Sequence, residues 1–248
     1  MQPSNPSVVR SAWRYWRDLA SRDGGFRATK EFFASLWEFV IESTPSHRRQ
    51  RFGDADYDWD YRVNTTSGAV GWRDRLLGEF FSAYQPTEPS LFHEMLSALQ
   101  EQVRLDLRQF TFIDLGSGKG RTLLMASDYP FKRIIGVELL PALNSIAQQN
   151  LKQYKSASQQ CFALESVCAD ATRFNLPDGP LVVYLFNPFL EAPLREALSN
   201  LEDDLRKTGR LVYVLYHNPV HDSILGESPS LTKLYGTHQY SIFSRSVE

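Results

Sequence analysis

The hydrophobic and polar positions follow a helical period in the first part of the chain. Apolar residues recur every three or four positions, which predicts helices over 8–20, 28–42 and 90–107. Ser90 is expected to cap the third of these helices at its N-terminus. Between 53 and 62, aspartates alternate with other residues, and we expect a solvated acidic loop there.

From residue 109 onward, short apolar runs alternate with amphipathic segments. The pattern predicts strands at 109–115, 133–139, 164–170, 180–186 and 209–216, with helices at 121–127, 141–151 and 189–201. Strands that alternate with helices form a mostly parallel sheet with right-handed crossovers. Runs at 231–235 and 240–246 predict a closing hairpin, and so an antiparallel C-terminal edge. The expected fold is α/β and Rossmann-like over 108–248, after an N-terminal helical extension over 1–107.

Composition and charge exclude several classes of partner. The chain has 248 residues, of which 42% are hydrophobic, and a net charge of −2. This balance gives no general attraction to polyphosphate, so we expect no nucleic-acid partner. The densest apolar stretch, 32–41, is too short to span a bilayer, and residues 1–7 lack a secretory signal pattern, so no membrane partner is expected. Cys161 and Cys168 form no disulfide framework, which favours a reducing, cytoplasmic location.

Two patterns suggest a metal and are rejected. The aspartates of 53–62 lack the glycine and glutamate positions of a calcium-binding loop. His217 and His221 are four residues apart, but Pro219 breaks any helix that would bring them together. No metal site is expected.

A glycine-rich loop follows the first predicted strand. Gly116, Gly118 and Gly120 come directly after Asp114 and Leu115. Glycines let the backbone turn and approach a ligand that a Cβ would push away. In an open α/β sheet, this position at the carboxyl end of the first strand is where ligands bind.

The spacing of the loop excludes two common nucleotide motifs. The dinucleotide pattern needs a third glycine at 121, where the chain has Arg121. The Walker pattern needs a glycine at 113, where it has Ile113. The motif that remains is an acid, one residue, and three alternating glycines.

The stretch D-L-G-S-G-K-G over 114–120 resembles the first motif of class I S-adenosyl-L-methionine-dependent methyltransferases. Glu138 closes the second strand, Asp170 the third, and Asn187-Pro188-Phe189 the fourth, in the order that the family shows. The resemblance implies that S-adenosyl-L-methionine is the cofactor, that Glu138 binds its ribose, and that Asp170 binds its adenine. The implied cofactor site comprises Asp114, Gly116, Ser117, Gly118, Glu138, Asp170, Ala171 and Asn187.

A narrower resemblance lies upstream. Y-Q-P-T over 84–87, followed by a helix and the glycine loop, resembles a DOT1-like bacterial group that includes protein-lysine methyltransferases. It implies that Tyr84 and Thr87 touch the methionine part of the cofactor. R-V-N-T-T-S-G over 62–68 also resembles a segment of uncharacterised bacterial relatives, and no chemistry is assigned to it.

Several residues keep a second interpretation. Asp170 fits a cap of the following turn, and Asn187 fits a turn residue before proline. Lys119 and Arg121 are expected to face solvent at a helix start, and the alternative for Arg121 is an ion pair with a substrate acid. His217, at the end of the fifth strand, is a candidate proton acceptor, so that Asn187 and His217 are the candidate catalytic residues.

These observations predict a methyltransferase that acts on an amine, either a protein lysine or a small molecule. The alternatives are a protein that binds S-adenosylmethionine or S-adenosylhomocysteine without turnover, an O-methyltransferase of a small molecule, and a nucleotide-dependent oxidoreductase, which Arg121 disfavours. The helices before residue 108 are expected to cover the cofactor and to shape the acceptor pocket.

Overall fold

The computed structural model describes residues 55–66, 86–186 and 191–246, together with 16, 17, 20, 25 and 29. The predicted helices over 8–20 and 28–42 lie almost entirely outside the described residues. The same holds for Tyr84 and Asn187, whose predicted roles therefore stay predictions.

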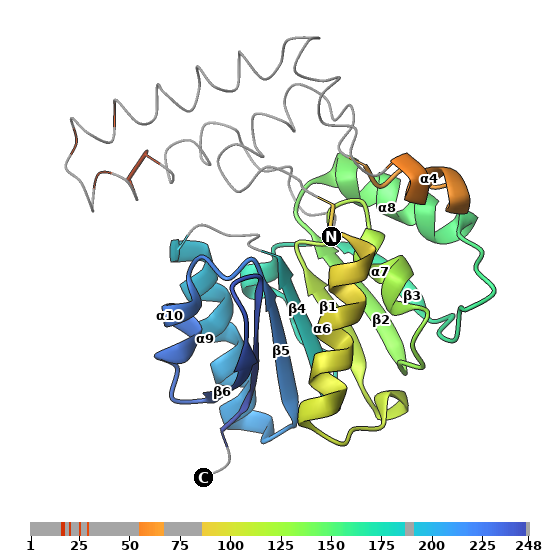
Figure 1. The fold of residues 1–248 in the computed structure, drawn as a ribbon. Helices are drawn as coiled ribbons and strands as arrows, with labels where there is room; N and C mark the ends of the chain where they lie inside the picture. Colours follow the sequence, from red (N-terminus) through yellow and green to blue (C-terminus); the bar gives the residue numbers. More distant parts are fainter. Residues whose placement is uncertain are drawn as a thin grey trace.

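Seven strands form one sheet in the order β3-β2-β1-β4-β5-β7-β6 (Figure 1). Their bounds are β1 Thr111–Leu115, β2 Arg133–Glu138, β3 Leu164–Cys168, β4 Leu181–Phe186, β5 Val212–His217, β6 Leu231–Gly236 and β7 Tyr240–Arg245. The first five pair in parallel, and β7 runs antiparallel to both β5 and β6. The predicted α/β fold, with its parallel sheet and antiparallel C-terminal edge, is confirmed.

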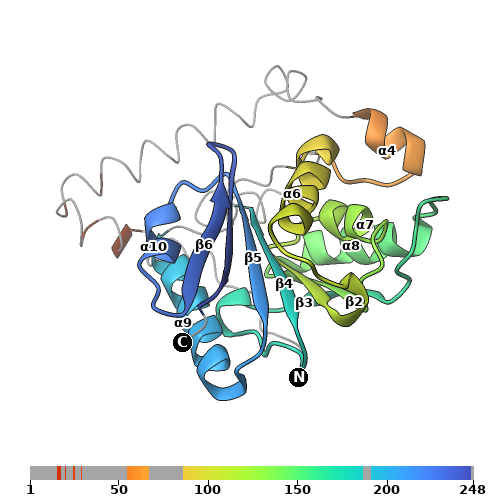
Figure 2. The ribbon, with the colours of Figure 1, turned by 60° about the horizontal axis from the view of Figure 1, so that its bottom comes forward.

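The central strands are apolar throughout because helices cover both faces of the sheet. Alternate residues of β1 enter different cores: Phe112 lies in one and Ile113 in the other. Helices α6 (Pro89–Gln102), α7 (Arg121–Ala126) and α8 (Pro141–Gln153) lie on the first face, and α9 (Glu191–Thr208) and α10 (Asp222–Gly226) lie on the second (Figure 2). Short 3₁₀ turns occur at Leu107–Gln109 and Ala171–Arg173.

The prediction of a solvated loop at 53–62 is wrong, because Ala55–Tyr61 form a helix, α4. Tyr57 and Tyr61, one turn apart, pack with tilted rings at 4.8 Å between centroids, and Tyr57 is buried in the core. Tyr61 also packs on Tyr154 at 5.2 Å. The alternating aspartates conceal this helix, because they give no helical period even though Tyr57 and Tyr61 are four residues apart.

Helix α6 begins and ends at residues other than those predicted. Its N-cap is Glu88, with Pro89 in the first turn, so the predicted cap at Ser90 is wrong. The helix ends at Gln102 because Val103 is already extended. Residues of α6 lie in the same core as β1, so this helix packs directly on the sheet. The division of the chain at residue 107 stays a prediction.

Phe112 and Phe162 should contribute differently to stability, because only Phe112 lies in the core. Phe112 is fully buried, and its ring lies 5.3 Å from that of Phe131. We expect Phe112→Ala to lower the free energy of unfolding by about 3–5 kcal/mol, through lost burial and the cavity left behind. Phe162→Ala, at a residue that is 78% exposed, should change it by less than about 0.5 kcal/mol. Urea unfolding measures both, and equal losses would contradict this core.

Candidate functional site

The carboxyl ends of the parallel strands meet at one edge of the sheet. The chain passes from β1 to β2 and β3 on one side, and then returns to β4 on the other side of β1. The crevice between β1 and β4 is therefore the topological switch point, where ligands bind in open α/β sheets. Glu138, Phe186 and His217 are the last residues of their strands at this edge.

The glycine loop takes a conformation that requires glycine. Gly116, Gly118 and Gly120 have φ values of 96°, 53° and 82°, all in the left-handed region. The Gly116 and Ser117 amides both donate to the carbonyl of Val137, at 2.8 and 3.1 Å. The loop is thus folded back against the end of β2, at the strand end where Glu138 lies.

Ser117 is a predicted cofactor-binding residue, and that role stays a prediction. Its side chain is buried against Gly136 of β2, where a Cβ would lie only 2.6 Å from Ser117 Oγ. This hydroxyl has no hydrogen-bond partner among the described residues. Gly136 is therefore a packing requirement of the loop, which the sequence pattern did not reveal.

Glu138 holds the loop and remains a possible acceptor of further hydrogen bonds. Its Oε2 accepts from the Gly118 amide at 2.8 Å, and its Oε1 accepts from the Leu140 amide at 2.7 Å. Burial raises the pKa of this carboxyl, and the amide hydrogen bonds oppose that shift. Each carboxylate oxygen can accept two hydrogen bonds, so the group retains capacity for a ligand hydroxyl.

Asp114 is the second buried carboxylate of the site. The Thr122 hydroxyl of α7 donates to its Oδ2. Burial, and to a lesser extent the charge of Glu138, raises the pKa of Asp114 to about 7. No ion pair between described residues involves Asp114 or Glu138.

A buried carboxylate without a cation is costly. A ligand with a cationic group and several hydroxyls would offset that cost here. The residues at the ends of β1 and β2 therefore fit S-adenosyl-L-methionine, which carries an ammonium group and a ribose.

Asp170 caps the short 3₁₀ turn that follows the third strand. Oδ1 of Asp170 accepts from the amide and the hydroxyl of Thr172, at 3.0 and 2.7 Å, so the expected alternative of a turn cap is present. Ala171 is buried in the core on the α9 side. Cys168 pairs in register with Glu138, the last residue of β2, and Asp170 follows Cys168 by two residues. Its role toward adenine stays a prediction.

Three polar side chains form a buried hydrogen-bonded chain across the strand ends. The Tyr184 hydroxyl lies 2.9 Å from Thr87 Oγ1 and 2.8 Å from His217 Nδ1. His217 also stacks on Phe186, with ring centroids 4.0 Å apart. Burial lowers the pKa of His217 to about 4, so the imidazole is neutral at pH 7. Sequence reasoning missed Tyr184, because it has the appearance of an ordinary core residue of a buried strand.

The prediction that Lys119 and Arg121 face solvent is wrong. Both are buried, with exposed fractions of 1% and 2%. Lys119 Nζ donates to the Thr66 carbonyl at 2.7 Å, and Arg121 Nε donates to Thr65 Oγ1 at 2.7 Å. These two basic side chains of the cofactor loop region therefore contact the R-V-N-T-T-S-G segment, to which the sequence had given no role.

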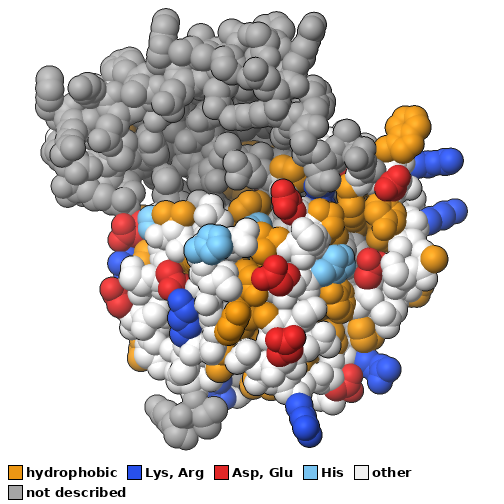
Figure 3. Space-filling view, in the orientation of Figure 1, with side chains coloured by type: hydrophobic (Ala, Val, Ile, Leu, Met, Phe, Trp, Pro, Cys, Tyr) orange, Lys and Arg blue, Asp and Glu red, His pale blue; other side chains and the backbone are white. Residues whose placement is uncertain are grey.

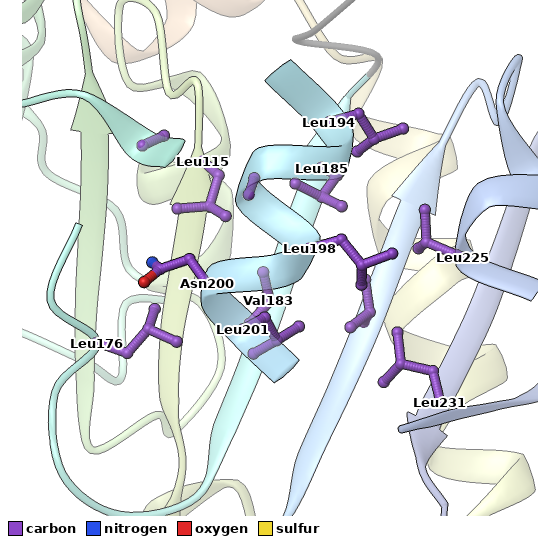
Figure 4. Close-up of a pocket in the computed structure, with 13 residues that line it drawn as sticks. Leu115, Leu176, Val183, Leu185, Leu194, Leu198, Asn200, Leu201, Leu225 and Leu231 are labelled. Carbon is purple, nitrogen blue, oxygen red and sulfur yellow. The ribbon is translucent and has the colours of Figure 1, made fainter. Parts of the chain in front are cut away.

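An apolar pocket lies on the opposite face of the sheet, beneath α9 (Figure 4). Leu115, Val183 and Leu185 point into it from the strands. Among the described residues that line it, Asn200 alone is polar, and its amide donates to the Phe174 carbonyl. This pocket offers no group suited to methyl transfer.

Metal-binding clusters and membrane-spanning helices are absent from the described part of the chain. No group of three His, Cys, Asp or Glu residues there could hold a metal ion. No helix within those residues is long and apolar enough to cross a membrane. On the face in view in Figure 3, the Lys and Arg side chains of the described surface stand apart from one another.

The family of the chain is established by comparison with known sequences. The family described as "Histone methylation protein DOT1" matches residues 79–214, more than half of the chain, and the chain belongs to it. A relative is the Drosophila melanogaster protein named "Histone-lysine N-methyltransferase, H3 lysine-79 specific", which is 28% identical over 138 residues. The match covers 50% of this chain but only 8% of that protein.

Similar solved structures include an RNA methyltransferase from Salinibacter ruber in complex with S-adenosyl-L-homocysteine. It is 19% identical, with a TM-score of 0.43, and the match covers 64% of this chain and 92% of that one. Magnesium protoporphyrin IX methyltransferase from Synechocystis PCC 6803 with bound SAM is 15% identical, with a TM-score of 0.45. The match covers 81% of this chain and 96% of that one. By its family, the chain carries a DOT1-like methyltransferase domain whose cofactor is S-adenosyl-L-methionine.

The raised pKa of Asp114 predicts how stability depends on pH. The folded-state pKa of about 7 exceeds the ordinary value of 3.8, so the ligand-free protein loses stability as pH rises through 7. We expect Asp114→Asn to remove this loss. Each pKa unit corresponds to about 1.4 kcal/mol, so the variant should gain a few kcal/mol relative to wild type between pH 5 and pH 8.

Urea unfolding of the ligand-free protein at the two pH values measures this difference. Asp178→Asn, at an exposed position, is the control and should leave the pH dependence unchanged. The same pH dependence in wild type and Asp114→Asn would contradict a buried, unpaired carboxylate.

Proposed function

We propose that this protein transfers the methyl group of S-adenosyl-L-methionine to an amine nitrogen, either of a protein lysine or of a small molecule. The observation that carries the proposal is the pair of buried carboxylates, Asp114 and Glu138, which lie beside a left-handed glycine loop and have no ion-pair partner among the described residues. Membership of the DOT1 family supports the reaction class. The name of the Drosophila relative, a histone-lysine N-methyltransferase, supports a lysine-type acceptor.

Each strand end has a proposed role in holding the cofactor. Glu138 accepts hydrogen bonds from the ribose hydroxyls, and Asp114, oriented by Thr122, faces the ammonium group. Asp170 and Ala171 lie toward the adenine. The backbone of Gly116, Ser117 and Gly118 forms the wall of the cofactor site on the β1 side. Tyr84 and Thr87 are assigned to the methionine end, and Asn187 to the space between donor and acceptor.

The cofactor, when bound, supplies a methyl group on a sulfonium, and no covalent enzyme intermediate is needed. The residues of the chain contribute alignment and exclusion of water, which together can lower a barrier by about 7–11 kcal/mol. Water is excluded at the ends of β4 and β5 by buried or partly buried side chains, those of Tyr184, Phe186 and His217. An amine that enters such a low-dielectric site loses its proton more readily, which makes its nitrogen nucleophilic.

The state of His217 favours an amine over a hydroxyl acceptor. A hydroxyl needs a general base whose pKa lies near the working pH. Burial lowers the pKa of His217 to about 4, so it is a weak base at pH 7. Its Nδ1 is also engaged by the Tyr184 hydroxyl. An amine, which can lose its proton to water before it reacts, does not require a stronger base.

The proposal is tested with the purified 248-residue chain and S-adenosylmethionine that carries a labelled methyl group. We expect calorimetric binding of S-adenosylhomocysteine but not of NAD, and transfer of label to amines in cell extract, located by mass spectrometry. Glu138→Gln should weaken cofactor binding at least about tenfold, since one charge-assisted hydrogen bond is worth roughly 1.5–3 kcal/mol. Glu165→Gln, which removes only an exposed ion pair with Arg133, is the control.

Three outcomes would contradict the proposal. Absence of S-adenosylhomocysteine binding would exclude the cofactor site. Binding without any label transfer would favour the non-catalytic alternative. Label found on oxygen would favour an O-methyltransferase.

His217 gives a separate prediction about the acceptor. General acid–base catalysis contributes about 10²–10⁴-fold in rate. If the acceptor is an amine, His217→Gln should lower kcat by less than about tenfold, because no side-chain base is needed. A loss beyond about 100-fold at saturating cofactor would identify His217 as the base and point to a hydroxyl acceptor. Steady-state kinetics with the identified acceptor measures the difference.

A further inference from the structure

The R-V-N-T-T-S-G segment begins directly after α4 and reaches the glycine loop. The chain turns at Arg62, whose φ is 53°, and residues 63–66 then continue without regular secondary structure. Helix α4 lies near α8, since Tyr61 packs against Tyr154 at the end of α8 (Figure 1). We refer to residues 57–66 as the clasp.

Asp58 fixes the internal shape of the clasp. Its carboxylate accepts hydrogen bonds from the amides of Thr65 and Thr66, at 2.8–2.9 Å, and from both threonine hydroxyls. Burial alone would raise the pKa of Asp58, but these hydrogen bonds lower it overall. The carboxylate therefore stays ionised and ties residues 65 and 66 to the helix that precedes them.

Asn150 joins the clasp to the glycine loop through a single side chain. Its Oδ1 accepts from the Asn64 amide at 2.8 Å. Its Nδ2 donates to the Asn64 carbonyl and to the Lys119 carbonyl, both at 2.9 Å. Asn150 is 2% exposed, so these bonds are shielded from water. One side-chain amide therefore holds the N–H and the carbonyl of Asn64 in the clasp and the carbonyl of Lys119 in the loop.

The face of α8 that carries Asn150 also packs against the loop. Ala147 lies one turn earlier, and a Cβ placed on Gly120 would be 3.2 Å from the Ala147 Cβ. The loop therefore contacts α8 twice, once through the bare backbone of Gly120 and once through Asn150. This close approach leaves little room for the loop to take another shape.

The side chains of Lys119 and Arg121 extend away from the loop into the clasp. Lys119 Nζ donates to Asn64 Oδ1 at 3.1 Å and to the Thr66 carbonyl at 2.7 Å. The Arg121 guanidinium lies 4.8 Å from the ring centroid of Tyr57. It also lies 3.6 Å from Asp58, the acid that organises the clasp. Two buried cations thus make polar contacts with the clasp.

We propose that Asn150 is a positioning residue for cofactor binding, and that the clasp, through Asn150, Lys119 and Arg121, holds the glycine loop in its cofactor-binding shape. This inference rests on the proposed function, because the loop is assumed to bind S-adenosylmethionine. It gives the R-V-N-T-T-S-G segment a role without requiring it to touch the cofactor. By thermodynamic linkage, the cofactor must in turn stabilise the docked clasp.

The first test compares two buried asparagines of α8. We expect Asn150→Ala to weaken S-adenosylhomocysteine binding at least tenfold in calorimetry, and to raise the KM for S-adenosylmethionine while leaving kcat at saturating cofactor within threefold. Asn144→Ala is the matched control. Asn144 is also buried, but its Oδ1 accepts a hydrogen bond from the Ser166 hydroxyl on β3 rather than from the loop. It should lower stability while affinity changes by less than threefold.

The second test uses the wild-type chain and so does not depend on how well the variant folds. Hydrogen exchange, followed by mass spectrometry, is measured on a peptide that covers residues 57–66, with and without saturating S-adenosylhomocysteine. We expect exchange in this peptide to slow at least threefold when the ligand binds. In Asn150→Ala, provided that circular dichroism shows it folded, this protection should be lost.

The outcomes separate the inference from the proposed function. If the wild type binds S-adenosylhomocysteine but the clasp peptide gains no protection, the inference is wrong and the proposed function stands. The same conclusion follows if folded Asn150→Ala binds as tightly as wild type, or if Asn144→Ala weakens binding to the same extent. If the wild type binds no S-adenosylhomocysteine, both are wrong.

Discussion

The hydrogen bond from the Gly118 amide to the Glu138 carboxylate connects the two halves of the candidate site. One half is a loop that only glycines can form, and the other is the acid at the end of β2. A carboxylate buried at this point, with Asp114 nearby and no cation paired with either among the described residues, is unfavourable in isolation. A ligand that supplies positive charge and hydroxyl groups would offset this cost, so the arrangement fits a ligand-binding site.

The same loop is supported from its other side by polar contacts that span the chain. Asn150 and the clasp hold its backbone, and the side chains of Lys119 and Arg121 point into the clasp. Helix α7, which follows the loop, supplies Thr122 to Asp114. The loop is consequently held by β2, α8 and the clasp together, and such preorganisation reduces the entropy that a ligand must otherwise offset on binding.

The sheet could be predicted from the sequence because each central strand is a short apolar run that helices cover on both faces. Because each apolar run marks a strand, the acids that end or follow such a run, Glu138 and Asp170, could be placed at strand ends. What could not be predicted depends on long-range contacts. Lys119 and Arg121 find partners 53 and 56 residues earlier in the chain, so their local sequence suggested solvent. Tyr184 became part of the site only when the fold brought Thr87 and His217 to its hydroxyl.

The most direct test of the central claim is the number of protons exchanged when S-adenosylhomocysteine binds at pH 7. It is obtained by calorimetry in buffers of different ionisation enthalpy. Burial raises the pKa of Asp114 to about 7, so the carboxyl is partly protonated in the free protein. The ammonium group of the ligand should lower that pKa, and binding should release a fraction of a proton that Asp114→Asn does not release. Binding with no proton release, or with equal release by the variant, would contradict the account.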